Sequence, residues 1–289
     1  MKKGLDVSSH NGNVNWDAVK NAGYGDFAII RLGIGNDFLT QDDSKFERNV
    51  QACERLGIPY GVYIYSYALN TGDAMSEANH TLRQLKKVGP NFKYGVWFDM
   101  EDADNYKKNH GMPDNSTLVD ICYTFCDIIE KSGYYTGIYA SLSWLNNEIR
   151  SPKLDRFDKW VAQWNNTGCT YKGVYSIWQY TSDCMIGGKR FDANELHRDF
   201  ATGGETPQPA PTPSVQKLHL PADAKTWRVY PLDKAPVKGN ECGILKPSKF
   251  GGLDYDIIRF TQPDVAVIKT RDFGTVQIYV APSTGAVIS

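Results

Sequence analysis

The chain has 289 residues, of which 41% are hydrophobic and 22% charged, and its net charge is −1 at pH 7. These values are typical of a soluble globular protein with one large and one small domain. The near-zero charge argues against a nucleic-acid partner, and the absence of any apolar run of 18 residues argues against membrane insertion.

The N-terminal sequence M-K-K-G-L-D-V-S-S-H has neither an apolar signal region nor a small-residue cleavage site. We therefore expect synthesis in a cytosol without a signal peptide. Six cysteines follow no framework spacing, and Cys122 and Cys126 lack the further cysteines or histidines that a metal site needs. Buried thiols are the better interpretation, and no metal or cofactor is predicted.

Short apolar segments alternate with helical ones up to about residue 200. The predicted strands are Gly4–Ser8, Phe27–Ile34, Tyr60–Tyr67, Tyr94–Glu101, Tyr134–Ser141, Lys159–Trp164, Val174–Tyr180 and a short one near Arg190–Ala193. The predicted helices between them are Trp16–Ala22, Ser44–Leu56, Ala74–Val88, Ser116–Lys131 and Ser143–Ile149. This alternation predicts an α/β fold for residues 1–202, an irregular (β/α) TIM-like barrel with parallel strands. The connections after Trp164 and Tyr180 are too short for helices, so we expect an incomplete barrel there.

The segment Y-G-V-W-F-D-M-E-D, residues 94–102, reads as a buried strand that ends in acids. Because strand side chains alternate between faces, Asp99 and Glu101 share a face while Met100 points away. In such a pair one carboxyl tends to have a raised pKa while the other stays ionised, which is the arrangement that a glycosidase uses. The alternative is a strand that ends in a solvated acidic turn, and the D-x-E spacing alone does not decide between the two.

Polar and aromatic residues also occur at the ends of the other predicted strands. In (β/α) barrels the carboxyl ends of the strands carry the chemistry. Aromatic rings there can stack on the apolar faces of sugars, although each ring taken alone could equally belong to the barrel core. The residues singled out for this site, besides Asp99 and Glu101, are Asp6, Asp192, Arg31, Gln179, Tyr63, Tyr65, Tyr139 and Trp164.

Residues 203–216, G-G-E-T-P-Q-P-A-P-T-P-S-V-Q, have proline at every second position from 207 to 213. This pattern predicts a semi-rigid spacer and hence a domain boundary. Residues 217–289 contain short β-rich runs between Pro, Gly and Asp turns, which favours a small all-β domain of SH3-like type. A tethered β module beside an enzyme often targets it to an insoluble polymer. A packing or oligomerisation module is the alternative, and the oligomeric state is not indicated.

Ordered motifs over about two thirds of the chain resemble the family-25 glycoside hydrolases, the Chalaropsis-type lysozymes. They are G-L-D-V-S-S-H-N-G, F-A-I-I-R-L-G, G-V-Y-I-Y, W-F-D-M-E, G-I-Y-A-S, W-V-A-Q-W, I-W-Q-Y-T-S and G-G-K-R-F-D-A-N. The chain departs from the family pattern at Ile64, where histidine is frequent, and at Met100, where valine is frequent. Neither departure removes a carboxylate.

The resemblance implies an N-acetylmuramidase that cuts the β-1,4 bond between N-acetylmuramic acid and N-acetylglucosamine in peptidoglycan. Glu101 would be the general acid, and Asp99 would orient the substrate's 2-acetamido group or stabilise the oxocarbenium-like charge. Asp6 and Asp192 would line the cleft and tune this pair. The missing signal and the C-terminal module resemble phage endolysins of Gram-positive hosts, which bind a cell-wall polymer and leave the cytoplasm through holin-dependent holes.

Other interpretations fit less well. The chitinase pattern D-x-x-D-x-D-x-E would place Trp97 and Tyr94 where two of its acids should be. A non-catalytic, lectin-like barrel is disfavoured because all the acids needed for catalysis are present. A nucleotide enzyme is disfavoured because G-I-G-N at residues 33–36 lacks the third glycine of a phosphate-binding loop.

Overall fold

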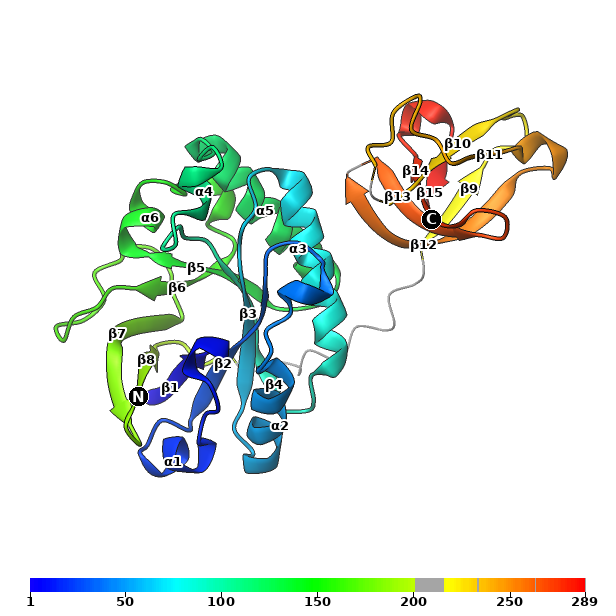
Figure 1. Ribbon diagram of the computed structural model, residues 1–289. Helices are drawn as coiled ribbons and strands as arrows, with labels where there is room; N and C mark the ends of the chain where they lie inside the picture. The colour runs from blue at the N-terminus through cyan, green and yellow to red at the C-terminus, as the bar shows by residue number, and fades with distance from the viewer. Residues whose placement is uncertain (201–215, 233, 263, 289) are drawn as a thin grey trace. The chain divides into compact units, whose positions relative to one another are not determined.

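The computed structural model describes residues 1–200, 216–232, 234–262 and 264–288 (Figure 1). The chain divides into two compact units, Met1–Ala210 and Pro211–Ser289. All of the predicted spacer 203–216 except residue 216 lies outside the described residues. The proposed boundaries at 202 and 217 therefore stay predictions.

The first unit is built on a closed, barrel-like sheet whose eight strands follow one another in sequence order. Neighbours from β1 to β7 pair in parallel, as predicted. The strands are β1 Lys2–Val7, β2 Phe27–Ile34, β3 Tyr60–Tyr65, β4 Phe92–Asp99, β5 Thr136–Ser141, β6 Asp158–Ala162, β7 Ile177–Ile186 and β8 Lys189–Leu196.

The helices α2, α3 and α5 pack outside the β2–β5 part of the barrel (Figure 1). The apolar residues of α2 recur every three or four positions, so Phe46, Val50 and Cys53 all face the core, and Gly57 ends the helix in a left-handed conformation. The five predicted helices are confirmed with shifted ends, and a short one, α4, was not predicted. The bounds are α1 Trp16–Asn21, α2 Phe46–Leu56, α3 Thr71–Gln84, α4 Tyr106–Asn109, α5 Asn115–Lys131 and α6 Leu142–Asn146.

The closure of the barrel differs from the prediction of an incomplete one. No helix joins β6 to β7 or β7 to β8, as expected, but β8 runs antiparallel to both β7 and β1 and closes the sheet. The β7–β8 turn is the two-residue loop Gly187–Gly188, and both glycines have positive φ. Such a loop matches the twist of a hairpin, and a Gly-Gly pair is a known hairpin signal. The prediction of an incomplete barrel was wrong because it assumed that a connection too short for a helix cannot close the sheet, whereas a short hairpin to an antiparallel strand does so.

Aromatic side chains fill the barrel interior below the carboxyl ends of the strands. The ring of Trp160 lies 4.5 Å from Tyr139, 5.9 Å from Tyr63 and 6.1 Å from Trp97, measured between centroids and in edge-to-face geometry. A larger apolar cluster lies between the outer face of the sheet and the helices. The interior is thus packed side chains, and the polar residues at the strand ends rest on an aromatic floor.

The second unit is a seven-stranded sheet in the order β11-β10-β14-β13-β12-β9-β15, with a core of its own. In the ten-residue strand β12, residues 253–256 pair with β9, and residues from 257 onward pair with β13. Across the described residues of both units, none of the helices combines the length and the apolar character of a membrane span. The strands are β9 Lys217–Leu220, β10 Trp227–Tyr230, β11 Gly243–Leu245, β12 Leu253–Gln262, β13 Val265–Thr270, β14 Gly274–Tyr279 and β15 Val287–Ile288.

Candidate active site

Asp99 is the last residue of β4, and Glu101 follows two positions later. Met100, between them, is buried in the apolar layer outside the sheet, so the predicted alternation of faces is confirmed. Asp99 is 4% exposed, and its carboxyl contacts that of Glu101 closely enough for a hydrogen bond. Burial raises the pKa of both groups, and the charge of Glu101 raises that of Asp99 further. Protonation is therefore favoured at both carboxyls relative to isolated ones, and more strongly at Asp99 than at Glu101.

Asp99 also has an oxygen without a partner. Its Oδ1 atom is buried and accepts no hydrogen bond among the described residues. An unpaired buried acceptor costs free energy, so such an atom in a native site calls for an explanation. A donor group of a bound substrate would supply the missing hydrogen bond.

Asp6 and Asp192 form a second carboxyl pair. They lie directly opposite each other on the antiparallel strands β1 and β8, with their carboxyls close enough to affect each other's pKa. Burial raises the pKa of both groups, and the charge of Asp192 adds to the rise for Asp6. The hairpin that closes the barrel is what brings residue 192 to the end of the first strand.

Asp6 is held by two buried amides. Its Oδ2 atom accepts hydrogen bonds from Gln179 Nε2 at 3.0 Å and Asn194 Nδ2 at 2.7 Å. Asn194 Oδ1 in turn accepts from Trp160 Nε1 at 2.8 Å, and Gln179 Oε1 accepts from the Tyr139 hydroxyl at 3.2 Å. Asn194 was not predicted, although its position two residues after Asp192 on one strand face is a signal that could have identified it.

The two carboxyl pairs converge on one site. The pKa of the Tyr139 phenol is raised, mainly by burial and then by the negative charges of Glu101, Asp99, Asp6 and Asp192 together. Burial likewise raises the pKa of Tyr63, and the charges of Asp6 and Asp99 raise it further. Burial also raises the pKa of Tyr65, and the charges of Glu101 and Asp99 add to this rise. Seven residues singled out from the sequence, which lie on β1, β3, β5 and β8 and at the end of β4, thus surround one volume at the end of the barrel, together with Gln179.

Trp164 and Arg31 differ in what they offer a ligand. Trp164 is 62% exposed, and its indole Nε1 donates to Gln179 Oε1 at 2.9 Å, so the ring is anchored at the site while its surface stays open. Arg31 lies near Tyr63, but its Nε donates to Asp43 Oδ2 at 2.8 Å and one terminal nitrogen donates to Ser9 Oγ at 2.9 Å. The guanidinium is therefore largely committed to contacts within the protein.

The loop after Glu101 carries residues that were not predicted. Asp102 Oδ1 accepts from the backbone N–H of Lys107 at 2.7 Å, and Asp104 accepts from the hydroxyls of Tyr65 at 3.2 Å and Tyr67 at 2.8 Å. The Lys107 side chain is fully buried. Charged residues in a loop usually indicate solvent exposure, so no sequence signal marks this lysine as internal.

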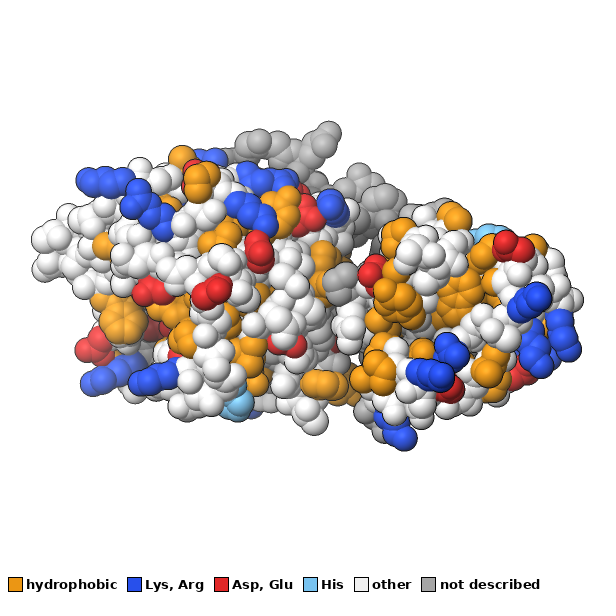
Figure 2. All heavy atoms as spheres, turned by 90° about the horizontal axis from the view of Figure 1, so that it is seen from above, with side chains coloured by type: hydrophobic (Ala, Val, Ile, Leu, Met, Phe, Trp, Pro, Cys, Tyr) orange, Lys and Arg blue, Asp and Glu red, His pale blue; other side chains and the backbone are white. Residues whose placement is uncertain are grey.

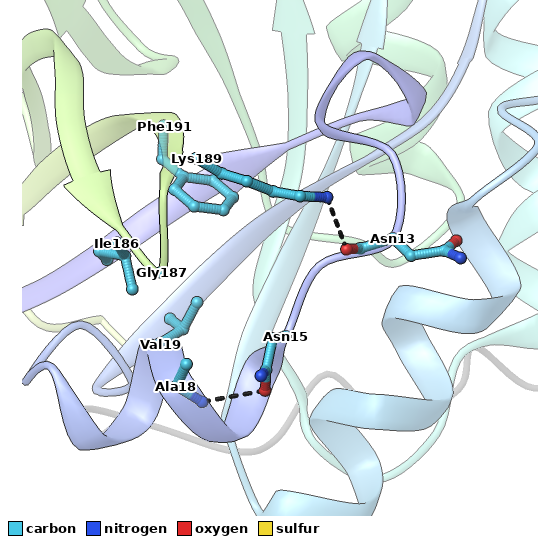
Figure 3. Close-up of a pocket in the computed structure, with 8 residues that line it drawn as sticks. All are labelled: Asn13, Asn15, Ala18, Val19, Ile186, Gly187, Lys189 and Phe191. Carbon is cyan, nitrogen blue, oxygen red and sulfur yellow. Dashed lines mark hydrogen bonds between the residues drawn. The ribbon is translucent and has the colours of Figure 1, made fainter.

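A small pocket of about 70 Å³ lies elsewhere on the barrel unit, between α1 and the β7–β8 hairpin (Figure 3). None of the four carboxylates lines it. Lys189 Nζ donates to the backbone oxygens of Asn11 and Asn13 at its edge, and Asn15 caps α1 through the N–H of Ala18. These contacts fasten the hairpin to the N-terminal loop, and they provide no acid or nucleophile.

The geometry supports acid–base chemistry on a neutral substrate. It offers two adjacent carboxyls whose pKa values are raised by burial, a second carboxyl pair close by and an exposed indole at the rim. Among the described residues, no group of three or more His, Cys, Asp or Glu side chains could hold a metal ion. Proton transfer and electrostatic stabilisation are the chemistry that these side chains can perform themselves.

Comparison with known proteins gives relatives for both function and fold. The endolysin of Listeria phage A511 is 50% identical over 77 residues, which cover 27% of this chain and 23% of that protein. Lysozyme M1 of Streptomyces globisporus is 24% identical over 209 residues, which cover 66% of each. The structure of the modular autolysin LytC from Streptococcus pneumoniae with a synthetic peptidoglycan ligand matches with a TM-score of 0.60 and 32% identity, covering 67% of this chain and 46% of that one.

This chain thus spans less than two thirds of the length of each of these relatives. A match to a family profile, in contrast, covers most of this chain. The sequence profile of the glycosyl hydrolases family 25 matches residues 5–189. This range includes Asp6, Asp99 and Glu101 but not Asp192. Since the match covers more than half of the chain, the protein belongs to glycosyl hydrolase family 25.

Proposed function

We propose that this protein is an N-acetylmuramidase, a lysozyme that hydrolyses the β-1,4 bond between N-acetylmuramic acid and N-acetylglucosamine in peptidoglycan. The observation that carries the proposal is the buried Asp99–Glu101 pair, in which two carboxyls lie within hydrogen-bond contact and burial raises the pKa of each, while Asp99 Oδ1 accepts no hydrogen bond among the described residues. Membership of the family, and relatives that are a lysozyme and an endolysin, support the same activity.

In this proposal Glu101 donates a proton to the leaving oxygen. In the free protein the larger rise in pKa favours protonation of Asp99 over Glu101, so substrate binding has to shift the proton to Glu101. The N–H of the substrate's 2-acetamido group can donate to the free Asp99 Oδ1, which stabilises Asp99 as a carboxylate and shifts the proton to Glu101. The acid is then protonated when substrate is bound, and Asp99 is charged where positive charge develops at the sugar.

The remaining residues of the site hold the sugar and tune the pair. Asp6 and Asp192 keep negative charge near Asp99 and Glu101, which opposes early ionisation of the acid. The exposed Trp164 ring provides a face for stacking. We assign Tyr63, Tyr65, Tyr139 and Gln179 to the walls of the substrate cleft, and Arg31 to the support of that cleft through Asp43 rather than to a direct charge contact.

Reducing-end analysis of purified, digested peptidoglycan tests the proposal. Wild-type protein should release new muramic-acid reducing ends, whereas Glu101→Gln at the same concentration should not. New glucosamine reducing ends would indicate a glucosaminidase, and new amino termini would indicate a peptide-cleaving enzyme. Binding to the walls without any new ends would favour the lectin-like alternative.

We further propose that residues 217–289 form an SH3-like domain that binds a cell-wall polymer. Support comes from its independent core and from exposed apolar side chains, among them Phe250 at 70% exposure and Ile258. Apolar and basic side chains lie next to each other on the face of this unit seen in Figure 2. The full chain should therefore be far more active than a fragment of residues 1–210 on intact walls, and the two should be equally active on soluble wall fragments. Equal activity of the two proteins on walls would favour a packing role for the tail.

The same set of features supports the role of a phage endolysin in a Gram-positive host, with a barrel of TIM type carrying the catalysis. Such a protein would be made in the host cytoplasm and would reach the wall only when a holin opens the membrane. Expression inside the host should therefore leave cells intact until the membrane is permeabilised. Lysis without permeabilisation would contradict this location.

A further inference from the structure

The charged side chain buried beneath the proposed acid pair is Lys107. It lies on α4, six residues after Glu101, and is 0% exposed. Its Nζ donates to the backbone oxygen of Glu101 at 2.8 Å and to the backbone oxygen of Ser66. Ser66 follows β3, so one ammonium ties together the ends of two neighbouring strands. Because the carbonyl belongs to Glu101 itself, Lys107 fixes the position from which the acid's side chain extends.

A buried ammonium is costly unless other charges compensate it. The groups that face Lys107 are the Tyr65 ring on β3, Glu77 on α3, Asp99 on β4, Asp102 in the loop after it, and Cys122 on α5. Burial lowers the pKa of Lys107, and the charges of the three acids oppose that change. The lysine is thus held as a cation by acids on several elements, one of which belongs to the proposed catalytic pair.

The influence also runs from the lysine to the acids. Burial raises the pKa of Asp99 and of Glu101, and the charge of Lys107 is among the effects that lower both. Lys107 is thus a cation whose charge acts on both members of the pair. Without it, both carboxyls would hold their protons to higher pH, and the pair would lose the negative charge that stabilises an oxocarbenium-like centre.

We propose that Lys107 is a positioning residue for the reaction: it locks the Glu101 backbone against Ser66 and keeps one negative charge on the Asp99–Glu101 pair. This inference rests on the proposed muramidase function. Lys107 does not itself touch substrate. Its effect passes through the geometry and the protonation of the two acids.

The barrel contains a matched control. Lys159 on β6 is 5% exposed, and its Nζ also donates to two backbone oxygens, those of Leu154 and Phe157. Its titratable neighbours are Cys126, Asp158, Asp155 and Cys122, and neither Asp99 nor Glu101 is among the main influences on it. Lys159→Met therefore removes an equally buried cation without touching the acid pair.

The test compares the pH profiles of peptidoglycan cleavage for wild type, Lys107→Met, Lys107→Gln, Lys107→Arg and Lys159→Met. Both neutral variants at 107 should lose at least about tenfold in rate at the wild-type optimum, because the acid is displaced. Both limbs of their profiles should move to higher pH, by about one unit. Lys107→Arg, which keeps the charge, should leave the limbs in place, and so should Lys159→Met.

Limbs that stay in place in the neutral variants, or that move equally in Lys159→Met, would overturn the proposal. If Lys107→Met does not fold, the pH profile of Lys107→Gln, whose side chain keeps a hydrogen-bond donor, tests the proposal alone. Loss of helical circular dichroism in both neutral variants would also overturn it, since the role would then be purely structural. If wild type releases no muramic-acid ends, the proposed function fails, and carboxyl carbon NMR titration of wild type and Lys107→Gln still shows whether Lys107 holds charge on the pair.

Discussion

Replacing Asp99 by asparagine should abolish activity and at the same time stabilise the barrel at neutral and alkaline pH. Asp99 is 4% exposed, one of its oxygens has no partner, and burial followed by the charge of Glu101 raises its pKa. Leaving a buried polar group unpaired costs about 1–3 kcal/mol, and more when the group is charged. Asparagine keeps the shape, removes the charge and can donate to Glu101. We therefore expect the free energy of unfolding to rise by about 1–2 kcal/mol at pH 8.

The gain should depend on pH with a definite sign. An unfolded aspartate has a pKa of about 3.9, and the folded pKa of Asp99 lies above it. The folded protein therefore binds this proton more tightly, so wild-type stability falls as the pH rises from the unfolded pKa through the folded one. The variant lacks this loss. The difference in stability should be near zero at pH 3.5 and should grow toward pH 8.

Urea unfolding followed by helical circular dichroism measures the effect in the barrel, because the described part of the second unit contains no α-helix. Asp43→Asn is the matched control: Asp43 is also buried, but it pairs with Arg31 at 2.8 Å. Removing one partner of a buried ion pair costs about 3–5 kcal/mol, so this variant should be less stable than wild type. An Asp99→Asn protein that is less stable than wild type at pH 8, or a gain that does not vary with pH, would refute the reasoning.

Three further predictions concern activity. Glu101→Gln should fold and bind walls but lose at least about a hundredfold in rate, since glutamine offers no acidic proton; more than a tenth of wild-type activity would exclude Glu101 as the acid. Trp164→Ala should raise KM on soluble muropeptides more than it lowers kcat, because the exposed ring contributes binding; an unchanged KM would remove it from the cleft. Asp6→Asn and Asp192→Asn should be milder lesions than Asp99→Asn, and the pH profile should shift to lower pH as negative charge is removed from the site; a complete loss of turnover in either would give that residue a direct role.

Much of this site was predictable because its signals are local. The alternation of Asp99, Met100 and Glu101 follows from strand geometry, and Met100 is indeed buried outside the sheet. The helix periods and the Gly187–Gly188 hairpin signal are also contained in short windows, although the hairpin was not recognised. Ordered motifs at successive strand ends indicated which acids and rings belong together, because carboxyl ends of parallel strands share one edge of a barrel.

Other features depend on contacts between distant parts of the chain. The Asp6–Asn194 hydrogen bond joins residues 188 positions apart and exists only because β8 turns back to close the barrel. The commitment of Arg31 to Asp43, and the burial of Lys107 beneath the acid pair, follow from how loops pack over the strand ends. Sequence patterns report the period and polarity of each element. The partner that a buried charge finds is decided by the tertiary fold, because only there does the free energy of desolvation have to be offset by a specific neighbour.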